Sequence, residues 1–211
     1  MANPLYGIFG GTFDPVHNGH LETVTTVFEK CALERVYFIP AAVPPHRDQP
    51  DASAQQRLEM VSLAIANYPR FDVDDRELKR ATPSYTYDTV KSLQTEDSSR
   101  RYCLILGIDA LSGLDSWYRW RELLDSIHFI IVRRPGWEIP EPLPDWWQQG
   151  RAEFIEDLKQ FECGKICLVE VEPNPVSATE IRYGIAQGID VSTMVPHSVW
   201  DYICTNKLYG A

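Results

Sequence analysis

The sequence has no long apolar run and an odd number of cysteines. No stretch approaches the ~20 apolar residues that a membrane-spanning helix needs. The first residues also lack the basic and apolar regions typical of an export signal. The five cysteines are irregularly spaced, and no second pair accompanies Cys163 and Cys167 as a metal site of that kind would require, so we expect reduced, structural thiols. These absences favour a cytoplasmic protein without a membrane partner.

Positive charge is also scarce, because 20 Lys and Arg residues face 30 Asp and Glu residues, giving a net charge of −10. This balance disfavours bulk electrostatic binding to nucleic acid or anionic lipid. A small anionic substrate remains compatible with it if positive potential is concentrated locally by a few Arg and His residues, helix ends and a divalent cation. The length suits one sizeable domain. We expect a single domain over residues 1–211, with closing helices at about 177–205.

Short apolar runs alternate with helical patterns along most of the chain. Such alternation predicts a Rossmann-like α/β fold, a doubly wound and mostly parallel sheet with helices on both faces. In these sheets, ligands bind beyond the carboxyl ends of the strands. The sequence predicts strands at 5–9, 36–39, 71–73, 102–106, 127–132 and 166–171, and the main helices after residue 20, after Ser53, and over 87–93, 118–124, 177–187 and 198–205.

The segment from Gly10 to His20 follows the first predicted strand and carries the strongest functional signal. Glycines let the backbone approach a phosphate closely, and a helix N-terminus offers N–H groups and a positive dipole end to an anion. His17 and His20 lie three residues apart, so both reach the same face of the helix. A metal site would need a third ligand that this pair does not supply. The pattern therefore favours phosphate binding.

Further motifs extend this pattern across the chain. The segment 10–21 resembles the signature of the HxGH nucleotidyltransferase superfamily, and within it the match is to the bacterial nicotinate-nucleotide adenylyltransferases. The resemblance covers nearly the whole chain and is specific through its combination of motifs. The other matching segments are 43–47, 77–80, 83–86, 107–109, 117–118, 133–136 and 176–182.

The resemblance implies adenylyl transfer from ATP to nicotinate mononucleotide in NAD biosynthesis, with Mg²⁺ assisting and no metal-ligating residue assigned. By this resemblance His17, His20 and Arg182 are the catalytic residues. The implied ATP-binding residues are Phe9, Gly10, Gly11, Thr12, His17, His20, Gly107, Asp109, Thr179 and Arg182. Ala178 stands where the family often has a serine, so no role is carried over to that position.

The resemblance also implies a substrate-binding group. A pyridinium ring is attracted to an indole face by stacking and cation–π contact, which suits Trp117. Backbone N–H groups near Thr86 and Tyr118 suit the carboxylate of nicotinate better than an amide. His46 and Arg47 suit the mononucleotide phosphate. In the family, a lysine is also common at the position of Arg47. The group comprises His46, Arg47, Ser84, Tyr85, Thr86, Trp117 and Tyr118.

Several alternatives remain open at this point. Arg182 also fits a surface position on an amphipathic helix, and Trp117 also fits core packing. Gly107 with Asp109 also fits a simple turn, and Asp14 fits either the phosphates or the stabilisation of its own loop. A sister activity on a pantetheine phosphate and a non-catalytic nucleotide-binding module are the alternative functions. The sequence leaves the oligomeric state undefined.

Overall fold

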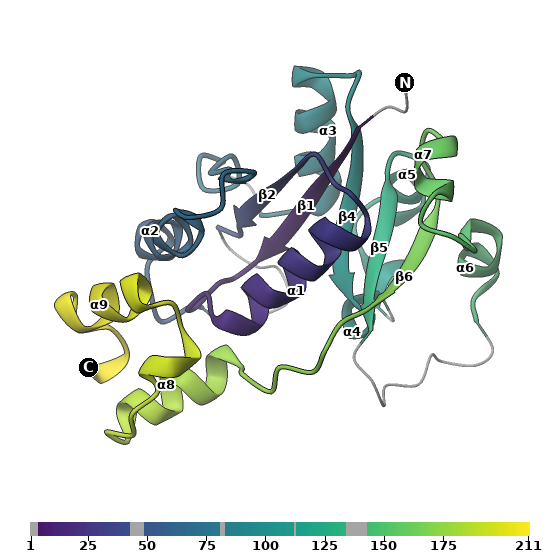
Figure 1. The fold of residues 1–211 in the computed structure, drawn as a ribbon. Coiled ribbons are helices and arrows are strands. Elements are labelled where there is room, and N and C mark those ends of the chain that lie inside the picture. Colours follow the sequence, from purple (N-terminus) through teal and green to yellow (C-terminus); the bar gives the residue numbers. More distant parts are fainter. Residues whose placement is uncertain (1–3, 43–48, 81–82, 112, 134–142) are drawn as a thin grey trace. The chain divides into compact units, whose positions relative to one another are not determined.

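The computed structural model describes residues 4–42, 49–80, 83–111, 113–133 and 143–211 (Figure 1). Its strands form one sheet with the order β3-β2-β1-β4-β5-β6. The pairs β1–β4, β4–β5 and β5–β6 are parallel. This confirms the predicted Rossmann-like α/β class. The strands are β1 (Leu5–Gly11), β2 (Arg35–Pro40), β3 (Phe71–Val73), β4 (Arg101–Gly107), β5 (His128–Arg133) and β6 (Ile166–Glu170).

The helices of the described residues are interleaved with these strands. The longer ones are α1 (Asn18–Lys30), α2 (Ala54–Ile65), α3 (Thr86–Glu96), α8 (Ala178–Ala186) and α9 (His197–Thr205). The short ones are α4 (Ile108–Leu111), α5 (Trp120–Leu124), α6 (Asp145–Gly150) and α7 (Asp157–Gln160), with 3₁₀ turns η1 (Leu114–Ser116), η2 (Ser192–Met194) and η3 (Leu208–Gly210). No helix among the described residues is long and apolar enough to cross a membrane.

The chain divides into two compact units, each assembled from three stretches of sequence. Unit 1 contains residues 1–9, 23–36 and 85–173, and unit 2 contains residues 10–22, 37–84 and 174–211. The HxGH segment and the predicted closing helices therefore belong to unit 2. The strands β4, β5 and β6 belong to unit 1. That residues 1–211 act as one domain stays a prediction.

The core of unit 1 surrounds β4 and β5, which lie side by side (Figure 1). Five consecutive residues of β5, from His128 to Val132, are buried. Successive strand side chains point to opposite faces, so a fully buried run shows that both faces of this strand are covered. The only polar residue of that run is His128, at its amino end.

Unit 2 is organised around α2, which packs against β3 and α9. Its N-cap is Ser53, as predicted, and a capping box completes it, since the side chains of Ser53 and Gln56 each accept a hydrogen bond from the other residue's backbone N–H. The buried face of α2 carries Met60, Val61 and Ala64 together with one charged residue, Arg57. A charged side chain in that position needs polar partners, and these are described below.

Some helices differ from the prediction. The helix expected over 118–124 begins at Trp120, because Arg119 adopts left-handed backbone angles (φ 53°, ψ 39°) just before it. The short helices α4, α6 and α7 were not predicted, since four to six residues carry too little periodicity to distinguish a helix from a turn. The helices predicted at 177–187 and 198–205 are present as α8 and α9, within a residue at each end.

Candidate active site

His17 and His20 lie together at the start of α1. Their rings stack with centroids 3.7 Å apart and planes inclined by 26°. The backbone N–H of His17 donates to Nδ1 of His20 at 3.3 Å. A neutral imidazole that accepts at Nδ1 carries its proton on Nε2, so Nε2 of His20 is a hydrogen-bond donor. The pairing predicted from the sequence is confirmed, and its geometry fixes a tautomer.

Two glycines allow the close packing around these histidines. A Cβ at Gly19 would lie 3.2 Å from Nδ1 of His17 and 3.5 Å from the side chain of Asn174. A Cβ at Gly11 would lie 3.0 Å from the ring of Phe13, which itself packs edge-on against His20. Larger residues at either position would displace the rings. At Gly10, by contrast, a Cβ would make an ordinary van der Waals contact, since its nearest neighbour is a carbonyl oxygen 3.9 Å away.

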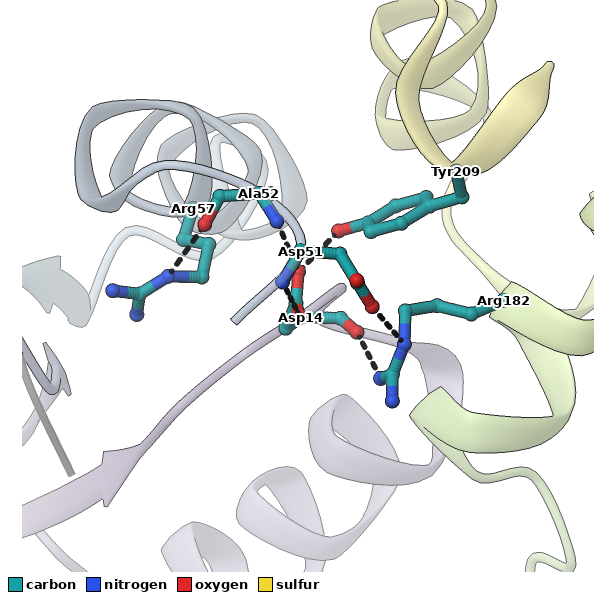
Figure 2. A network of polar contacts seen from close by, with 6 residues as sticks. All are labelled: Asp14, Asp51, Ala52, Arg57, Arg182 and Tyr209. Atoms are coloured by element: carbon teal, nitrogen blue, oxygen red, sulfur yellow. Dashed lines mark hydrogen bonds and ion pairs between the residues drawn. The ribbon is translucent and has the colours of Figure 1, made fainter. Parts of the chain in front are cut away.

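Asp14 holds the loop that leads into α1 (Figure 2). Its buried carboxylate accepts hydrogen bonds from the backbone N–H groups of Asp51 at 2.8 Å and Ala52 at 3.1 Å. It accepts a further one from the hydroxyl of Tyr209 at 2.7 Å. Asp14 and these partners together come from the three separate stretches of unit 2. The sequence left open whether Asp14 stabilises its loop, and the structure shows that it does.

Arg182, on α8, joins the same network (Figure 2). Its Nη1 donates to the carbonyl oxygen of Asp14 at 2.7 Å, and its Nε lies 2.8 Å from Oδ2 of Asp51. Two acceptors therefore fix the plane of the guanidinium, whose remaining N–H groups form an end-on donor face. The side chain is 29% exposed. Arg182 is thus no freely rotating surface arginine, and it lies in the same unit as the histidines.

The buried side chain of Arg57 contacts the backbone of the same loop at Thr12. Arg57 is 1% exposed, and its guanidinium donates to the carbonyl oxygens of Thr12 at 2.6 Å, Ala42 at 3.2 Å and Ala52 at 3.3 Å. Burial lowers the pKa of Arg57, and the nearby carboxylate of Asp14 acts in the opposite direction. Because all three acceptors are backbone groups, Arg57 fixes the path of the chain through Thr12.

The amino end of α8 is fixed by a second capping box. The Oγ of Ser177 accepts from the N–H of Glu180 at 3.2 Å, and the Glu180 carboxylate accepts from the N–H of Ser177 at 3.2 Å. Thr179 lies in the first turn of this helix and is exposed. Arg182 follows one turn after Ala178. The capping box therefore sets the position from which both Thr179 and Arg182 project.

The residues predicted to bind the adenosine end belong to unit 1, as does Phe9 in β1. Gly107 is the last residue of β4, and Asp109 is exposed in the following turn of helix. A Cβ at Gly107 would lie 2.3 Å from Oδ1 of Asp109, so the carboxylate folds back over the glycine. The prediction that this segment follows a strand end is confirmed. Its role in binding remains a prediction.

Aromatic residues of the predicted acceptor group also gather in unit 1. The rings of Tyr85 and Tyr118 lie 4.7 Å apart, and Tyr87 meets Tyr118 edge-on at 6.1 Å. Arg119 lies over the ring of Tyr87 at 4.4 Å. Tyr118 is 49% exposed and Trp117 is half-buried, so a ligand in solution can reach this cluster.

The remaining members of the acceptor group have different surroundings. Thr86 is the first residue of α3. Ser84, in unit 2, accepts a hydrogen bond from the N–H of Ala42 at 3.0 Å and so holds the chain after β2. His46 and Arg47 lie outside the described residues.

Sequence reasoning missed three residues of the network. Asp51 and Tyr209 stand in segments without any recognisable pattern, and only the fold brings them to Asp14. Arg57 did carry a signal, since it is a charged residue on the apolar face of a predicted helix. Such a residue needs buried acceptors, and an acceptor-rich loop is one source of them.

Known proteins are similar to this chain over most of its length. A cytidylyltransferase-like family model matches residues 8–184. A probable nicotinate-nucleotide adenylyltransferase of Aeromonas hydrophila is 42% identical over 99% of both chains. One from Serratia proteamaculans is 43% identical over 97% of this chain and 95% of its own.

Solved structures show the same fold. Plasmodium falciparum nicotinic acid mononucleotide adenylyltransferase, in complex with NaAD, aligns with a TM-score of 0.75 at 19% identity over 98% of both chains. A putative nicotinate-nucleotide adenylyltransferase from Vibrio parahaemolyticus aligns with a TM-score of 0.64 at 16% identity, over 98% of this chain and 96% of that one. The chain therefore belongs to the cytidylyltransferase-like family and, within it, to the nicotinate-nucleotide adenylyltransferases.

Proposed function

We propose that this chain transfers the adenylyl group of ATP to nicotinate mononucleotide, giving nicotinate adenine dinucleotide and pyrophosphate. The observation that carries the proposal is the stacked pair His17 and His20 beside a glycine loop, in one unit with the fixed guanidinium of Arg182. Family membership supports the same activity over the full length of the chain. All three residues predicted to be catalytic thus belong to unit 2.

The reaction is an in-line displacement without a covalent enzyme intermediate. An oxygen of the acceptor 5′-phosphate attacks the α-phosphorus of ATP, and the bond from that phosphorus to the bridging oxygen of the β-phosphate breaks. A phosphate monoester has a second pKa near ~6, so the attacking group is largely ionised at neutral pH. No general base is required. Catalysis then depends on aligning two anions and stabilising charge on the α-phosphate and the departing pyrophosphate.

The donors of unit 2 suit that task. The Nε2–H of His20 is directed by the hydrogen bond at Nδ1, and His17 is held against it. The first turn of α1 contains no acidic residue, so the positive end of its dipole is not offset from within the helix. Arg182 and Thr179 supply donors from α8 for the outer phosphates of ATP. We assign the α-phosphate to the histidines and the leaving pyrophosphate to Arg182.

Mg²⁺ accompanies ATP in this proposal. Within the ranges that the structure covers, no group of three or more His, Cys, Asp and Glu side chains is arranged to hold a metal ion. Mg²⁺ keeps several of its waters and commonly binds through substrate phosphates, so an ion carried by the triphosphate fits these residues. It would offset the charge that develops on the leaving group.

The aromatic cluster of unit 1 is the proposed acceptor site. A positively charged pyridinium ring suits the face of Trp117. The rings of the neighbouring Tyr118 and Tyr85 lie 4.7 Å apart and are tilted by 35°. Phe9, Gly107 and Asp109 are proposed for the adenosine end of ATP. His46 and Arg47 are proposed for the mononucleotide phosphate on the resemblance alone.

Replacing Trp117 by alanine tests the acceptor site. Trp117→Ala is expected to raise the KM for nicotinate mononucleotide about tenfold or more, because stacking and cation–π contact are lost, while the KM for ATP stays nearly unchanged. Initial rates of pyrophosphate release, measured with each substrate varied in turn, give both constants. Trp146→Ala is the matched control, since Trp146 is a half-buried tryptophan of the same unit outside the predicted site. Equal losses for both substrates would count against ring stacking.

A panel of acceptors tests the function itself. With ATP and Mg²⁺, pyrophosphate release is expected with nicotinate mononucleotide, much less with its amide and none with phosphopantetheine. Release with phosphopantetheine alone would identify the sister activity instead. ATP binding without release for any acceptor would identify a non-catalytic nucleotide-binding module.

A further inference from the structure

We propose that Tyr209 is a positioning residue for the ATP phosphates: its hydroxyl fixes Asp14, and Asp14 with Asp51 fixes the guanidinium of Arg182. The inference rests on the proposed function only in taking the triphosphate of ATP as the ligand of Arg182. Figure 2 shows the four side chains converging from separate segments of unit 2.

The contact of Tyr209 is well placed to fix the carboxylate. Its hydroxyl donates to Oδ1 of Asp14 at 2.7 Å, the shortest of the three hydrogen bonds that this carboxylate accepts in the described structure. Burial, with the Asp14 carboxylate adding to it, raises the pKa of Tyr209 well above its usual range. The phenol therefore stays protonated and donates at every pH at which the protein works.

The backbone beneath Tyr209 is held in a strained conformation. Tyr209 has φ 59° and ψ 13°, and Lys207, two residues earlier, has φ 51°. Left-handed angles in residues other than glycine are strained and persist only where surrounding contacts maintain them. The turn η3 packs against α8 and α9 through the buried Leu208, which anchors it. In this conformation the phenol of Tyr209 reaches Oδ1 of Asp14.

Arg182 depends on Asp14 in two ways, once through its backbone and once through its side chain. Its Nη1 donates to the carbonyl oxygen of Asp14, and its Nε pairs with Asp51, whose own N–H is bound by the Asp14 side chain. Movement of Asp14 therefore shifts both acceptors of the guanidinium together. Among the residues that the structure describes, loss of the phenol leaves Oδ1 of Asp14 with the 3.1 Å bond from Ala52 alone. Tyr209 thus acts through Asp14 and Asp51 on Arg182, without touching the nucleotide.

Replacing Tyr209 by phenylalanine removes this hydroxyl and little else. Tyr209→Phe is expected to raise the Kd and the KM for ATP about tenfold, as a lost hydrogen bond to a charged group would. The KM for nicotinate mononucleotide should stay within about twofold, whereas kcat should fall as well, because Arg182 also faces the leaving pyrophosphate. Calorimetry with ATP measures the Kd, and pyrophosphate release measures the kinetic constants. Tyr183→Phe is the matched control, because Tyr183 lies on α8 with 64% of its surface exposed.

A double variant distinguishes positioning from general support of the fold. If Tyr209 acts through Arg182, Tyr209→Phe should add nothing to the loss of ATP affinity caused by Arg182→Ala. Additive losses would overturn the inference, and so would equal rises in KM for both substrates. Unchanged ATP affinity alongside a lower melting temperature would also overturn it, by leaving Tyr209 a stabilising role alone.

A measurement on the unmodified protein tests the inference even if the variant does not fold. In hydrogen exchange, ATP is expected to slow exchange at Asp51 and Ala52 together with η3, since both hold Asp14. No change at η3 on ATP binding would contradict the inference. Wild-type protein that binds ATP but releases no pyrophosphate would refute the proposed function alone, and an active enzyme indifferent to Tyr209→Phe would refute this inference alone.

Discussion

At the scale of single residues, the direction of one proton decides what His20 can do. Because Nδ1 accepts from the N–H of His17, the ring presents Nε2–H as a donor from the amino end of α1. An asparagine at this position places its side-chain oxygen near where Nδ1 stands and offers nothing in place of Nε2. An asparagine can therefore keep the hydrogen bond from the N–H of His17 while lacking the proposed donor.

His20→Asn is therefore expected to fold normally and to lose activity. One missing donor to a transition-state oxyanion lowers kcat by about 10²-fold or more, whereas the melting temperature should change little. Thermal unfolding and initial-rate measurements test the two parts separately. His197→Asn is the control, because His197 lies on α9 with its side chain 87% exposed. Near-normal turnover in His20→Asn would remove this imidazole from the chemistry.

Residues also show where sequence reasoning ends. His17, His20 and Arg182 could be proposed as site residues because each lies within a recognisable motif, and their catalytic roles stay predictions. Asp14 was recognised with two possible roles, and only its partners decided between them. Tyr209 could not be predicted, since 195 residues separate it from Asp14 and no local pattern marks a residue that acts across such a distance.

At the scale of elements, α8 is set by its capping box, and the same helix carries Arg182. Ser177→Ala removes the hydroxyl that accepts from the N–H of Glu180 and is expected to cost about 1 kcal/mol of stability. The fraying first turn also carries Thr179, so the KM for ATP should rise as well. Urea unfolding and ATP kinetics measure both effects. Ser177→Thr keeps a capping hydroxyl and should restore both, whereas a threonine variant as impaired as the alanine variant would contradict this role.

Elements were the most predictable scale. All six strands were expected, because short apolar runs bounded by glycine and proline identify them. Helices α2 and α8 also begin where expected, with Ser53 and Ser177 as their N-caps. The short helix α6 was not expected. Trp147, its one buried residue, carries no helical periodicity by itself, and only tertiary packing selects its conformation.

At the scale of the whole molecule, the net charge of −10 sets the electrostatic background. Asp14 and Asp51 place two carboxylates beside the proposed phosphate site, and Arg182 contacts both residues. A triphosphate would meet repulsion there unless Arg182 and Mg²⁺ offset it. Because basic residues are few in this chain, we expect triphosphate binding to depend on the fixed position of Arg182.

The buried His128 links the stability of the molecule to pH. Its Nδ1 accepts from the N–H of Lys165 at 3.2 Å and its Nε2 therefore donates to the carbonyl oxygen of Phe161 at 3.1 Å, which holds the ring neutral. Burial lowers the pKa of His128 to about 4. Below its ordinary pKa of about 6.5, the unfolded chain binds a proton that the native chain does not. Stability is therefore lost as the pH falls from about 6.5 towards about 4.

His128→Phe should abolish this part of the pH dependence while lowering stability at neutral pH, where Lys165 and Phe161 lose their partner. Between about pH 7.5 and pH 4.5, the wild type is expected to lose about 2–3 kcal/mol more of its free energy of unfolding than the variant. Urea unfolding across that range measures the difference, and it subtracts the carboxylates that both proteins share. His197→Phe, at an exposed histidine, should keep the wild-type slope. Parallel curves for wild type and His128→Phe would show that the histidine in β5 is protonated in the folded protein as readily as in the unfolded chain.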